Sequence, residues 1–194
     1  MNKGRIIVIS GPSGSGKTTL SKRLLSRPKF KGKLVRSISA TTRLKRPGEK
    51  NNRDYIFISP KRFESKIKAG HFLEWQKVFD NYYGTLKKNV EELLKRGKNV
   101  LLCIDVKGAK VVFGKFPRAA GIFIKTPAIS VLKRRLLARG ESFLSLKLRL
   151  KTAHQELKES TKYDYIIIND NLKKASKNLE NIIAEVIKPG VLAE

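Results

Sequence analysis

Acidic residues, cysteines and long apolar runs are all scarce in this sequence of 194 residues. Its 16 Asp and Glu residues stand against 43 Lys and Arg residues, which gives a formal net charge of +27. The one cysteine, Cys103, excludes an internal disulfide bond and a zinc site built from cysteines. The longest apolar runs have about five residues, whereas a membrane-spanning helix needs about 20, and the N-terminus lacks the apolar core of a signal peptide. We therefore expect a soluble, cytoplasmic protein with no membrane partner.

The composition is that of a folded protein in spite of its charge. Hydrophobic residues make up 40% of the chain and recur from one end to the other, which disordered chains do not show. The length suits one compact unit that carries small inserted pieces. Because Lys and Arg are scattered along the chain, we interpret most of them as solvated surface charge. Nucleic acid is expected to bind only by non-specific electrostatic attraction.

Short apolar runs alternate with amphipathic segments along most of the chain. The apolar runs predict strands that are covered on both faces, at residues 5–10, 34–39, 99–104, 121–125 and 164–169. The amphipathic segments predict helices at residues 17–26, 86–96, 128–138, 144–158 and 172–187. Ser59-Pro60 and Thr126-Pro127 each place a capping hydroxyl before a proline, the pattern of a helix start. The alternation predicts an α/β fold built on a five-stranded parallel sheet.

Two segments depart from this alternation. Residues 39–85 combine arginines, aromatic side chains and short strand-like pieces. We predict an inserted subdomain here, attached to a core formed by residues 1–38 and 86–194. A less regular stretch that begins at Arg139 predicts a mobile lid at about residues 139–149, within the core.

A glycine-rich segment lies between the first predicted strand and the first predicted helix. It matches the phosphate-loop pattern G-x-x-x-x-G-K-[ST] in full, in the strand-to-helix setting that confirms this pattern. The residues predicted to bind a triphosphate are Gly11, Ser13, Gly14, Ser15, Gly16, Lys17, Thr18 and Thr19. Backbone N–H groups of such a loop point at phosphate oxygens, the lysine contacts the β- and γ-phosphates, and the hydroxyl of Thr18 is the predicted ligand of Mg²⁺. The loop alone leaves the acceptor of the phosphoryl group open.

Further motifs along the chain resemble those of one enzyme family. They are Ser37-Ile38-Ser39-Ala40-Thr41-Thr42-Arg43, Arg46-Pro47-Gly48-Glu49, Asp54-Tyr55, Phe72-Leu73-Glu74-Trp75, Asn81-Tyr82-Tyr83-Gly84-Thr85, Ile104-Asp105-Val106-Lys107-Gly108, Arg139-Gly140 and Tyr163-Asp164-Tyr165-Ile166-Ile167-Ile168-Asn169-Asp170. In order and spacing they resemble guanylate kinases over roughly residues 4–187. The resemblance implies a P-loop kinase fold and the Mg²⁺-dependent transfer of the γ-phosphoryl group of ATP to GMP, giving GDP and ADP.

The resemblance assigns the recognition of GMP mainly to the inserted subdomain. Glu74 matches the glutamate that accepts hydrogen bonds from two adjacent donors of guanine, the N1–H and the exocyclic amine. Because adenine presents an acceptor in place of one donor, a buried Glu74 would reject it. The residues that match further base-recognition positions are Ser39, Thr85 and Asp105. Those that match ligands of the GMP phosphate are Arg43, Arg46, Tyr55 and Tyr83.

The resemblance also implies how the phosphoryl group is transferred. A phosphate acceptor is already an anion at neutral pH, so no general base is needed. The groups expected to stabilise the transition state are Lys17, Arg43 and two lid arginines, Arg139 and Arg149. Asn169 matches the residue that approaches the adenine of ATP.

The chain departs from the family pattern in several places. Cys103 stands where members often carry the first acid of an Asp-Ile-Asp motif, so that Asp105 is the acid that remains. Asp80 and Asn52 stand where glycines are common, and Asn tolerates the left-handed backbone that glycine allows. The lid is one residue shorter than is usual. We interpret Cys103 as a small buried hydrophobic residue and Trp75 as a core aromatic.

Three other interpretations stay open at this point. A kinase of the same fold could act on another phosphorylated acceptor, such as a ribose phosphate, and would not need Glu74. A guanylate-kinase-like interaction module would bind partners without catalysis, although such modules lose the phosphate loop. Nucleic-acid binding driven by the net charge of +27 would weaken steeply with salt.

Overall fold

The computed structural model describes residues 4–140 and 142–188. Its strands are β1 (Ile6–Ser10), β2 (Leu34–Arg36), β3 (Ala40–Thr41), β4 (Ile56–Phe57), β5 (Phe72–Val78), β6 (Asn81–Leu86), β7 (Asn99–Cys103), β8 (Ala120–Lys125) and β9 (Tyr165–Ile168). Its α-helices are α1 (Lys17–Leu25), α2 (Pro60–Lys68), α3 (Lys87–Lys95), α4 (Val106–Lys115), α5 (Ile129–Leu137), α6 (Phe143–Lys158) and α7 (Leu172–Val186). Two 3₁₀ helices are η1 (Pro28–Phe30) and η2 (Glu159–Lys162). Across the described residues, no helix combines the length and hydropathy that a membrane span requires.

The main sheet is parallel throughout and has the strand order β2-β7-β1-β8-β9. Its five strands lie where the sequence predicts strands, which confirms the predicted α/β fold. The central strand β1 is buried along its whole length. Because alternate side chains of a strand point to opposite faces, Ile7 and Ile9 join one apolar cluster while Ile6 and Val8 join another. The sheet therefore carries an apolar core on each face.

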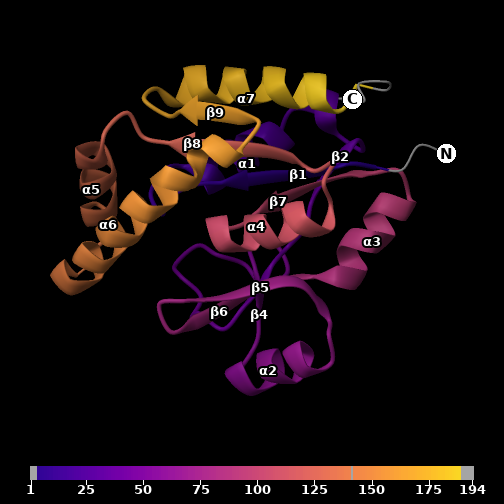
Figure 1. Ribbon diagram of the computed structural model, residues 1–194, viewed down its shortest axis with the longest axis horizontal. Coiled ribbons are helices and arrows are strands. Elements are labelled where there is room, and N and C mark those ends of the chain that lie inside the picture. Colours follow the sequence, from indigo (N-terminus) through magenta and orange to yellow (C-terminus); the bar gives the residue numbers. More distant parts are fainter. Residues whose placement is uncertain (1–3, 141, 189–194) are drawn as a thin grey trace.

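Helices complete both of these cores. On one face α1 and α7 contribute Leu20, Leu24 and Leu179 to the first cluster. On the other face α3 and α4 contribute Val90 and Val112 to the second cluster. Figure 1 shows α7 above the sheet and both α3 and α4 below it. The burial of each such side chain stabilises the fold by about 1.5 to 3 kcal/mol, so the ends of β1 and β7 are held firmly.

A second sheet, of order β4-β3-β6-β5, lies within the predicted insertion. The helix α2 covers it, and the ring of Phe63 stacks on Phe72 and Tyr82 with centroid distances of 4.3 and 5.2 Å. As predicted, α2 begins with a proline after Ser59, whose side chain caps the helix. Asn52 adopts the left-handed backbone, with φ 58°. The second sheet and α2 lie below the main sheet in Figure 1.

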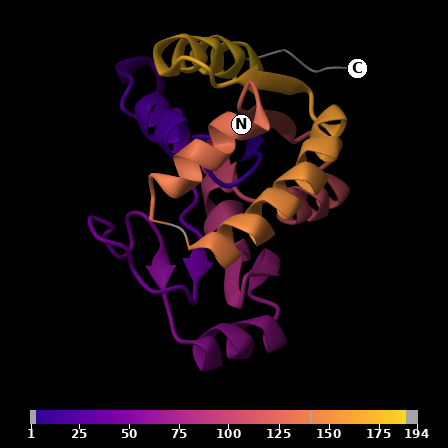
Figure 2. The ribbon, with the colours of Figure 1, turned by 90° about the vertical axis from the view of Figure 1, so that its left-hand side faces the viewer.

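The predicted lid is largely helical. Helices α5 and α6 pack together through an apolar cluster that contains Leu132, Leu136, Leu146 and Ala153. Helix α6 begins at Phe143, which confirms the helix predicted at residues 144–158, and Ser142 caps it by accepting from a backbone N–H. Figure 2 shows α5 and α6 facing the viewer, with the second sheet and α2 below them.

Some details differ from the sequence predictions. Both α4 and β6 are missing from the predicted elements. The predicted helix start at Thr126-Pro127 is wrong, because α5 begins after Ala128 and the Thr126 hydroxyl donates to the Ala128 carbonyl oxygen instead. Trp75 is 40% exposed and packs edge-on against Tyr82, so its interpretation as a core aromatic is wrong. Cys103 is only half-buried, at the end of β7.

Candidate active site

A cavity of about 300 Å³ lies at the carboxyl ends of β1 and β7, bounded by the main sheet, the inserted sheet and α6. This end of a parallel sheet is the usual place for a ligand. Most of the predicted site residues line the cavity: Gly11, Ser13, Gly14, Gly16, Lys17, Thr18, Thr19, Ser39, Arg43, Arg46, Tyr55, Glu74, Tyr83, Asp105, Arg139 and Arg149. The predicted residues Ser15, Thr85 and Asn169 are buried behind this lining. Folding therefore brings distant motifs to one place.

The phosphate loop follows β1 directly and requires glycine at two points. Gly11 has φ 134° and Gly16 has φ 102°, a range that side chains rarely adopt. A Cβ at Gly11 would lie 2.1 Å from the carbonyl oxygen of Ile124, and a Cβ at Gly16 would lie 2.2 Å from the side-chain nitrogen Nδ2 of Asn169. Glycine alone allows the loop to curl this closely against the strands β8 and β9. The loop leads into the N-terminus of α1, whose dipole favours an anion there.

Lys17 and the residues behind the loop hold its shape. The Lys17 ammonium donates to the carbonyl oxygens of the first two loop residues, at 2.5 and 2.9 Å. The Asn169 side-chain amide donates to the Ser15 carbonyl oxygen at 2.7 Å. The Arg135 guanidinium donates to the carbonyl oxygens of Ser15 and Asn169, at 3.4 and 2.9 Å. Asn169 thus braces the loop from behind, while its predicted contact with adenine stays a prediction.

A buried carboxylate faces the cavity from the inserted sheet. Glu74 on β5 is only 6% exposed, and the Thr85 hydroxyl on β6 donates to its Oε1 at 2.5 Å. The helix α4 approaches so closely that a Cβ at Gly108 would lie 2.5 Å from Oε2. Burial raises the pKa of Glu74 to about 7, the Thr85 hydrogen bond opposes this, and the charge of Asp105 adds to it. A carboxylate so placed suits a ligand with two adjacent donors.

Asp105 follows β7 and faces the same cavity. Its Oδ1 accepts from the backbone N–H of Gly108 at 2.7 Å, which caps α4. Burial raises the pKa of Asp105, and the cap and the charge of Lys17 oppose the rise. One carboxylate oxygen is therefore engaged by the helix. Cys103, two residues earlier, also lines the cavity.

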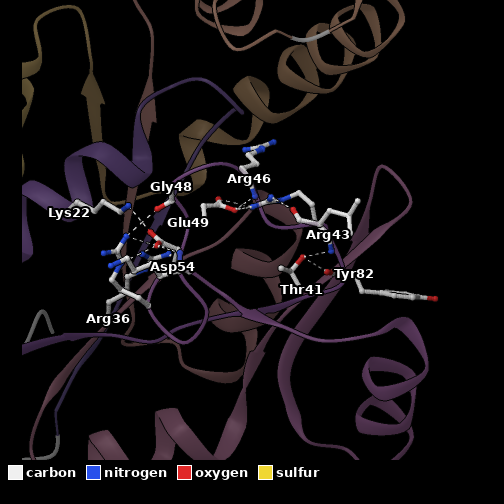
Figure 3. Close-up of polar contacts among 12 residues, drawn as sticks. Lys22, Arg36, Thr41, Arg43, Arg46, Gly48, Glu49, Asp54 and Tyr82 are labelled. Atoms are coloured by element: carbon white, nitrogen blue, oxygen red, sulfur yellow. Dashed lines mark hydrogen bonds and ion pairs between the residues drawn. The ribbon is translucent and has the colours of Figure 1, made fainter.

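An ion pair with Glu49 fixes the side chain of Arg43, as Figure 3 shows. The Arg43 guanidinium donates to both carboxylate oxygens of Glu49, at 2.8 and 3.0 Å. Glu49 also accepts from the backbone N–H of Arg46 at 2.9 Å. Arg43 lies over the rings of Tyr55 and Phe57, at 5.4 and 5.8 Å from their centroids. The guanidinium is thus held at the cavity wall, where it can meet a phosphate.

Asp54 connects the insertion to the core, and Figure 3 shows this second group of contacts. It is only 4% exposed and pairs at 2.6 Å with Lys22, which lies on α1 one turn after the phosphate loop. Arg53 donates to its carboxylate at 3.1 Å, and Arg36 on β2 donates to its carbonyl oxygen at 3.2 Å. Hydrogen bonds from Lys22 and from a backbone N–H hold the pKa of Asp54 well below its usual range. These contacts place the neighbouring Tyr55 relative to the core.

Helix α6, which includes part of the predicted lid, contacts both the phosphate loop and the turn of the inserted sheet. The Arg149 guanidinium donates to the Ser13 hydroxyl at 3.3 Å and lies 4.7 Å from the ring centroid of Phe79. Phe79 and Asp80 form the turn between β5 and β6, with φ 45° and 61°. Glycine adopts this left-handed backbone most readily, and Asp80 adopts it with a side chain. Arg149 therefore bridges the phosphate loop and the tip of the inserted sheet, and Arg139 lines the cavity beside it.

Comparison with known proteins agrees with this arrangement. A family model described as Guanylate kinase matches residues 3–186. The guanylate kinase of Fusobacterium nucleatum is 47% identical over 189 residues, which cover 97% of this chain and 100% of that protein. The guanylate kinase of Carboxydothermus hydrogenoformans is 44% identical over 191 residues, which cover 97% of this chain and 92% of that protein. The chain belongs to the guanylate kinase family.

A solved structure supports the same conclusion for the fold. The crystal structure of guanylate kinase from Anaplasma phagocytophilum superposes with a TM-score of 0.77 at 31% identity, covering 97% of this chain and 89% of that chain. Membership of the guanylate kinase family confirms the predicted P-loop kinase fold and makes the chain a nucleoside monophosphate kinase. The complete phosphate loop fits an enzyme of this family better than an interaction module.

Some residues of the cavity wall are not among those predicted from the sequence, above all Glu156 on α6. Arg149, Thr152 and Glu156 follow one another at intervals of three and four, so they share one face of the helix, and all three line the cavity. This spacing of polar residues is a signal that could have found them. Burial raises the pKa of Glu156 to about 7, the charge of Lys17 opposes the rise, and that of Asp105 adds to it.

Proposed function

We propose that this cavity is where the chain transfers the γ-phosphoryl group of ATP to GMP, giving ADP and GDP. The observation that carries the proposal is that the phosphate loop and the buried carboxylate of Glu74 line one cavity. The loop suits a triphosphate, and the carboxylate suits the two-donor edge of guanine. Substrates that reach these two groups together would lie end to end, with their phosphates in the middle.

On the donor side, main-chain groups would hold the triphosphate. The N–H groups of residues 11–18 would surround the β- and γ-phosphates, and Lys17 would turn from the loop carbonyls to the γ-phosphate oxygens. Asn169 would remain behind the loop and also meet the adenine ring, as the family pattern implies. This side recognises phosphates in general, because backbone donors read no base.

On the acceptor side, side chains would bind GMP. Glu74 would accept from the N1–H and the amine of guanine, with Ser39, Thr85 and Asp105 completing base recognition. The residues that would bind the phosphate are Arg43, Arg46, Tyr55 and Tyr83. Arg43 is already held in place by Glu49, so little side-chain freedom is lost when the phosphate binds.

Transfer itself would depend on alignment and charge. An oxygen of the GMP phosphate forms a bond to the γ-phosphorus of ATP while the bond to the bridging β–γ oxygen breaks, and ADP leaves with that electron pair. No proton has to be removed from the acceptor phosphate. Lys17, Arg43, Arg139 and Arg149 would stabilise the spreading negative charge, and the lid would exclude water as a competing acceptor.

The oxygen atoms near Lys17 suit Mg²⁺. The hydroxyl of Thr18 and the carboxylates of Asp105 and Glu156 line the same cavity. Kinase sites bind Mg²⁺ through such hard oxygen donors together with substrate phosphates and water, and not through a complete protein cage. Residues 4–140 and 142–188 accordingly hold no group of three or more His, Cys, Asp or Glu side chains that forms a metal site alone. We propose Thr18 as the direct ligand; when bound, the ion would neutralise charge on the phosphate oxygens.

The separate binding of ATP and GMP suggests that the chain consists of two structural units. We propose that residues 39–85 form a GMP-binding unit inserted in a core of residues 1–38 and 86–194, with the lid at about 139–149 closing over the site. The second sheet and its own apolar cluster support this division. The ends of the core range and position 141 lie outside the described residues.

We further propose a cytoplasmic enzyme whose partners are ATP and GMP. A reducing compartment suits the free thiol of Cys103 in the cavity wall. The net charge of +27 would attract nucleic acid only non-specifically, with an affinity that falls steeply with salt.

Substrate preference of a Glu74→Gln variant tests the proposal. A coupled assay would measure kcat/KM with GMP, AMP, UMP and ribose phosphates. The unchanged protein should prefer GMP by about 10⁴-fold or more over AMP. In the variant, kcat/KM for GMP should fall by about 10²-fold, because a charged hydrogen bond contributes about 1.5 to 3 kcal/mol and the amide can accept only one of the two. The Kd for ATP should not change.

The matched control is Glu64→Gln, the same chemical change on the exposed face of α2. It should leave all these values unaltered. Unchanged use of GMP in Glu74→Gln, or comparable turnover of a ribose phosphate, would contradict the proposed recognition.

A further inference from the structure

Glu156 is an acid of the cavity wall to which no specific contact has been assigned so far. It lies near the carboxyl end of α6, on the helix face that also carries Arg149 and Thr152. Arg149 contacts the phosphate loop at Ser13, so this face of α6 looks toward the triphosphate site. Glu156 lines the same cavity as Lys17.

The other acids of the cavity wall already have partners. Glu49 binds Arg43, Asp54 binds Lys22, Glu74 accepts from Thr85, and Asp105 accepts from the backbone N–H of Gly108. Within the described part of the chain, by contrast, Glu156 accepts no hydrogen bond and forms no ion pair within 4 Å. Its interactions are longer-range ones with the charges of Lys17, Asp105 and Lys107. A half-buried carboxylate that faces another acid is normally stabilised by a cation or donor.

A bound triphosphate would make this need stronger. Two carboxylates, Asp105 and Glu156, would then face the strongly negative phosphate chain, and like charges at short range repel. Lys17 is engaged by the phosphates and cannot neutralise both. A divalent cation between the carboxylates and the phosphates turns the same arrangement from repulsive to attractive.

Cys103 stands near these acids where a further carboxylate is common in the family pattern. This thiol also lines the cavity, but it is a poor partner for a hard cation and its water ligands. Asp105 has one oxygen engaged by the α4 cap, so it offers one oxygen to the cavity. Glu156 can therefore supply carboxylate oxygens where the neighbouring wall supplies few.

We infer that Glu156, acting with Asp105, accepts hydrogen bonds from the water ligands of Mg²⁺ in the Mg²⁺–ATP complex, and so makes tight ATP binding depend on the metal. The inference rests on the proposed function, since it requires ATP at the phosphate loop. Glu156 is a positioning residue here: it touches neither the phosphates nor the metal. As part of α6, it also joins the lid helix to the donor site.

Metal-dependent nucleotide affinity of Glu156→Gln tests the inference. Isothermal titration would measure the Kd of the non-hydrolysable analogue adenylyl imidodiphosphate in excess Mg²⁺ and again in EDTA, giving the ratio of the two constants. In the variant, affinity with Mg²⁺ should fall by about 10-fold or more, the usual loss when an outer-shell partner of a metal is removed. Affinity in EDTA should stay equal or rise, because a negative charge facing the phosphates has been removed. A merely structural role would weaken both affinities alike.

Two further variants complete the experiment. Glu156→Asp keeps the charge and should retain more of the metal dependence than the Gln variant. Glu159→Gln makes the same change three residues on, outside the cavity and in contact with Lys162, and should behave as the unchanged protein. With Mn²⁺ in place of Mg²⁺, electron paramagnetic resonance of the free ion should report weaker metal binding to the nucleotide complex of Glu156→Gln.

The possible results separate the inference from the proposed function. An unchanged ratio of affinities, or an equal loss with and without metal, would overturn the role of Glu156 while leaving the kinase proposal intact. Failure of the unchanged protein to bind the analogue at all would overturn the proposed donor site and the inference with it.

Discussion

The two halves of the cavity are built by different physical means. The donor half is a backbone structure: positive φ angles at Gly11 and Gly16 shape it, and two apolar clusters hold the strand that precedes it. The acceptor half is a side-chain structure, in which charged pairs such as Arg43 with Glu49 hold the functional groups. Its apolar cluster is small, with Ala40, Phe63 and Phe72 as the fully buried members.

This difference explains which half carries specificity. Backbone N–H groups read the charge and shape of phosphates, which all nucleotides share. In the proposed function, Glu74 and Thr85 would read the pattern of donors on a base, which differs between guanine and adenine. Side-chain pairs can be exchanged in evolution without rebuilding the fold, whereas a glycine at φ above zero cannot. We therefore expect changes in the two halves to have separable effects.

The largest expected effect follows from Lys17→Ala, which breaks the donor half. Removing one donor aimed at developing charge lowers kcat by roughly 10²- to 10³-fold. GMP affinity should persist, because the acceptor half holds its residues through contacts that do not involve Lys17. Steady-state kinetics and calorimetry with GMP alone would measure the two quantities.

Arg23→Ala is the matched control for this prediction. It removes a positive charge from the same helix, but its side chain is exposed and lies outside the cavity lining. Turnover should stay near that of the unchanged protein. Near-normal turnover in Lys17→Ala would reject the phosphate-loop assignment, and parallel losses in both variants would point to net charge instead.

The substitution Phe63→Ala should destabilise the acceptor half of the cavity. Its ring stacks on Phe72 and Tyr82, so its removal should destabilise the inserted sheet by about 3 to 5 kcal/mol. The single tryptophan, Trp75, lies on β5 of this sheet and reports its unfolding by fluorescence, while far-UV circular dichroism reports mainly the helices of the core. In urea, the fluorescence transition should shift to lower concentration than the dichroism transition.

Leu24→Ala supplies the contrasting case. Leu24 lies in the core cluster under α7, and its truncation should cost a similar 2 to 5 kcal/mol, at about the scale of other buried leucines. Here both signals should move together, because the insertion depends on the core for its attachment. A single shared transition in Phe63→Ala would mean that residues 39–85 do not unfold as a separate unit.

The strands of the main sheet could be predicted because each is a continuous apolar run with both faces covered. Helix α4 could not. Gly108 and the β-branched residues of α4 have low helix propensity, yet Gly108 is required where Glu74 approaches, since a Cβ would lie 2.5 Å from Oε2. The local helix signal was thus weakened by a residue that the site requires.

The site, too, has parts that could be predicted from local sequence and parts that could not. The phosphate loop could be predicted from eight consecutive residues, because its chemistry is local. The pairing of Lys22 with Asp54 could not be predicted, because it joins segments far apart in the chain. The spacing of polar residues on α6 marks Glu156, but only the folded chain shows that this helix face meets the cavity. Resemblance to a family supplied the roles of Glu74 and the arginines, which no local pattern gives. Tertiary contacts, not propensities, determine these positions.

The smallest expected effect concerns stability and pH, again through Glu74→Gln. The pKa of Glu74 is raised from 4.5 to about 7 in the folded protein, chiefly by burial. The charged form is therefore less favourable in the folded than in the unfolded state, so this group lowers stability at a pH above its folded pKa. As the pH falls toward the unfolded value of 4.5, the destabilisation disappears. The amide of Gln carries no charge and escapes this effect at every pH.

The variant without nucleotide should thus have a higher Tm than the unchanged protein at about pH 8, by roughly 2 °C or more for each kcal/mol gained at this chain length. The difference should shrink steadily as the pH is lowered to about 4. Thr85 can still donate to the amide oxygen, so the hydrogen bond inside the site is kept. Differential scanning calorimetry across this range measures the effect, with Glu64→Gln as the exposed control. A difference in Tm that is constant with pH would mean that Glu74 ionises as easily in the folded protein as in water. Water would then reach the Glu74 carboxylate more freely than its burial indicates.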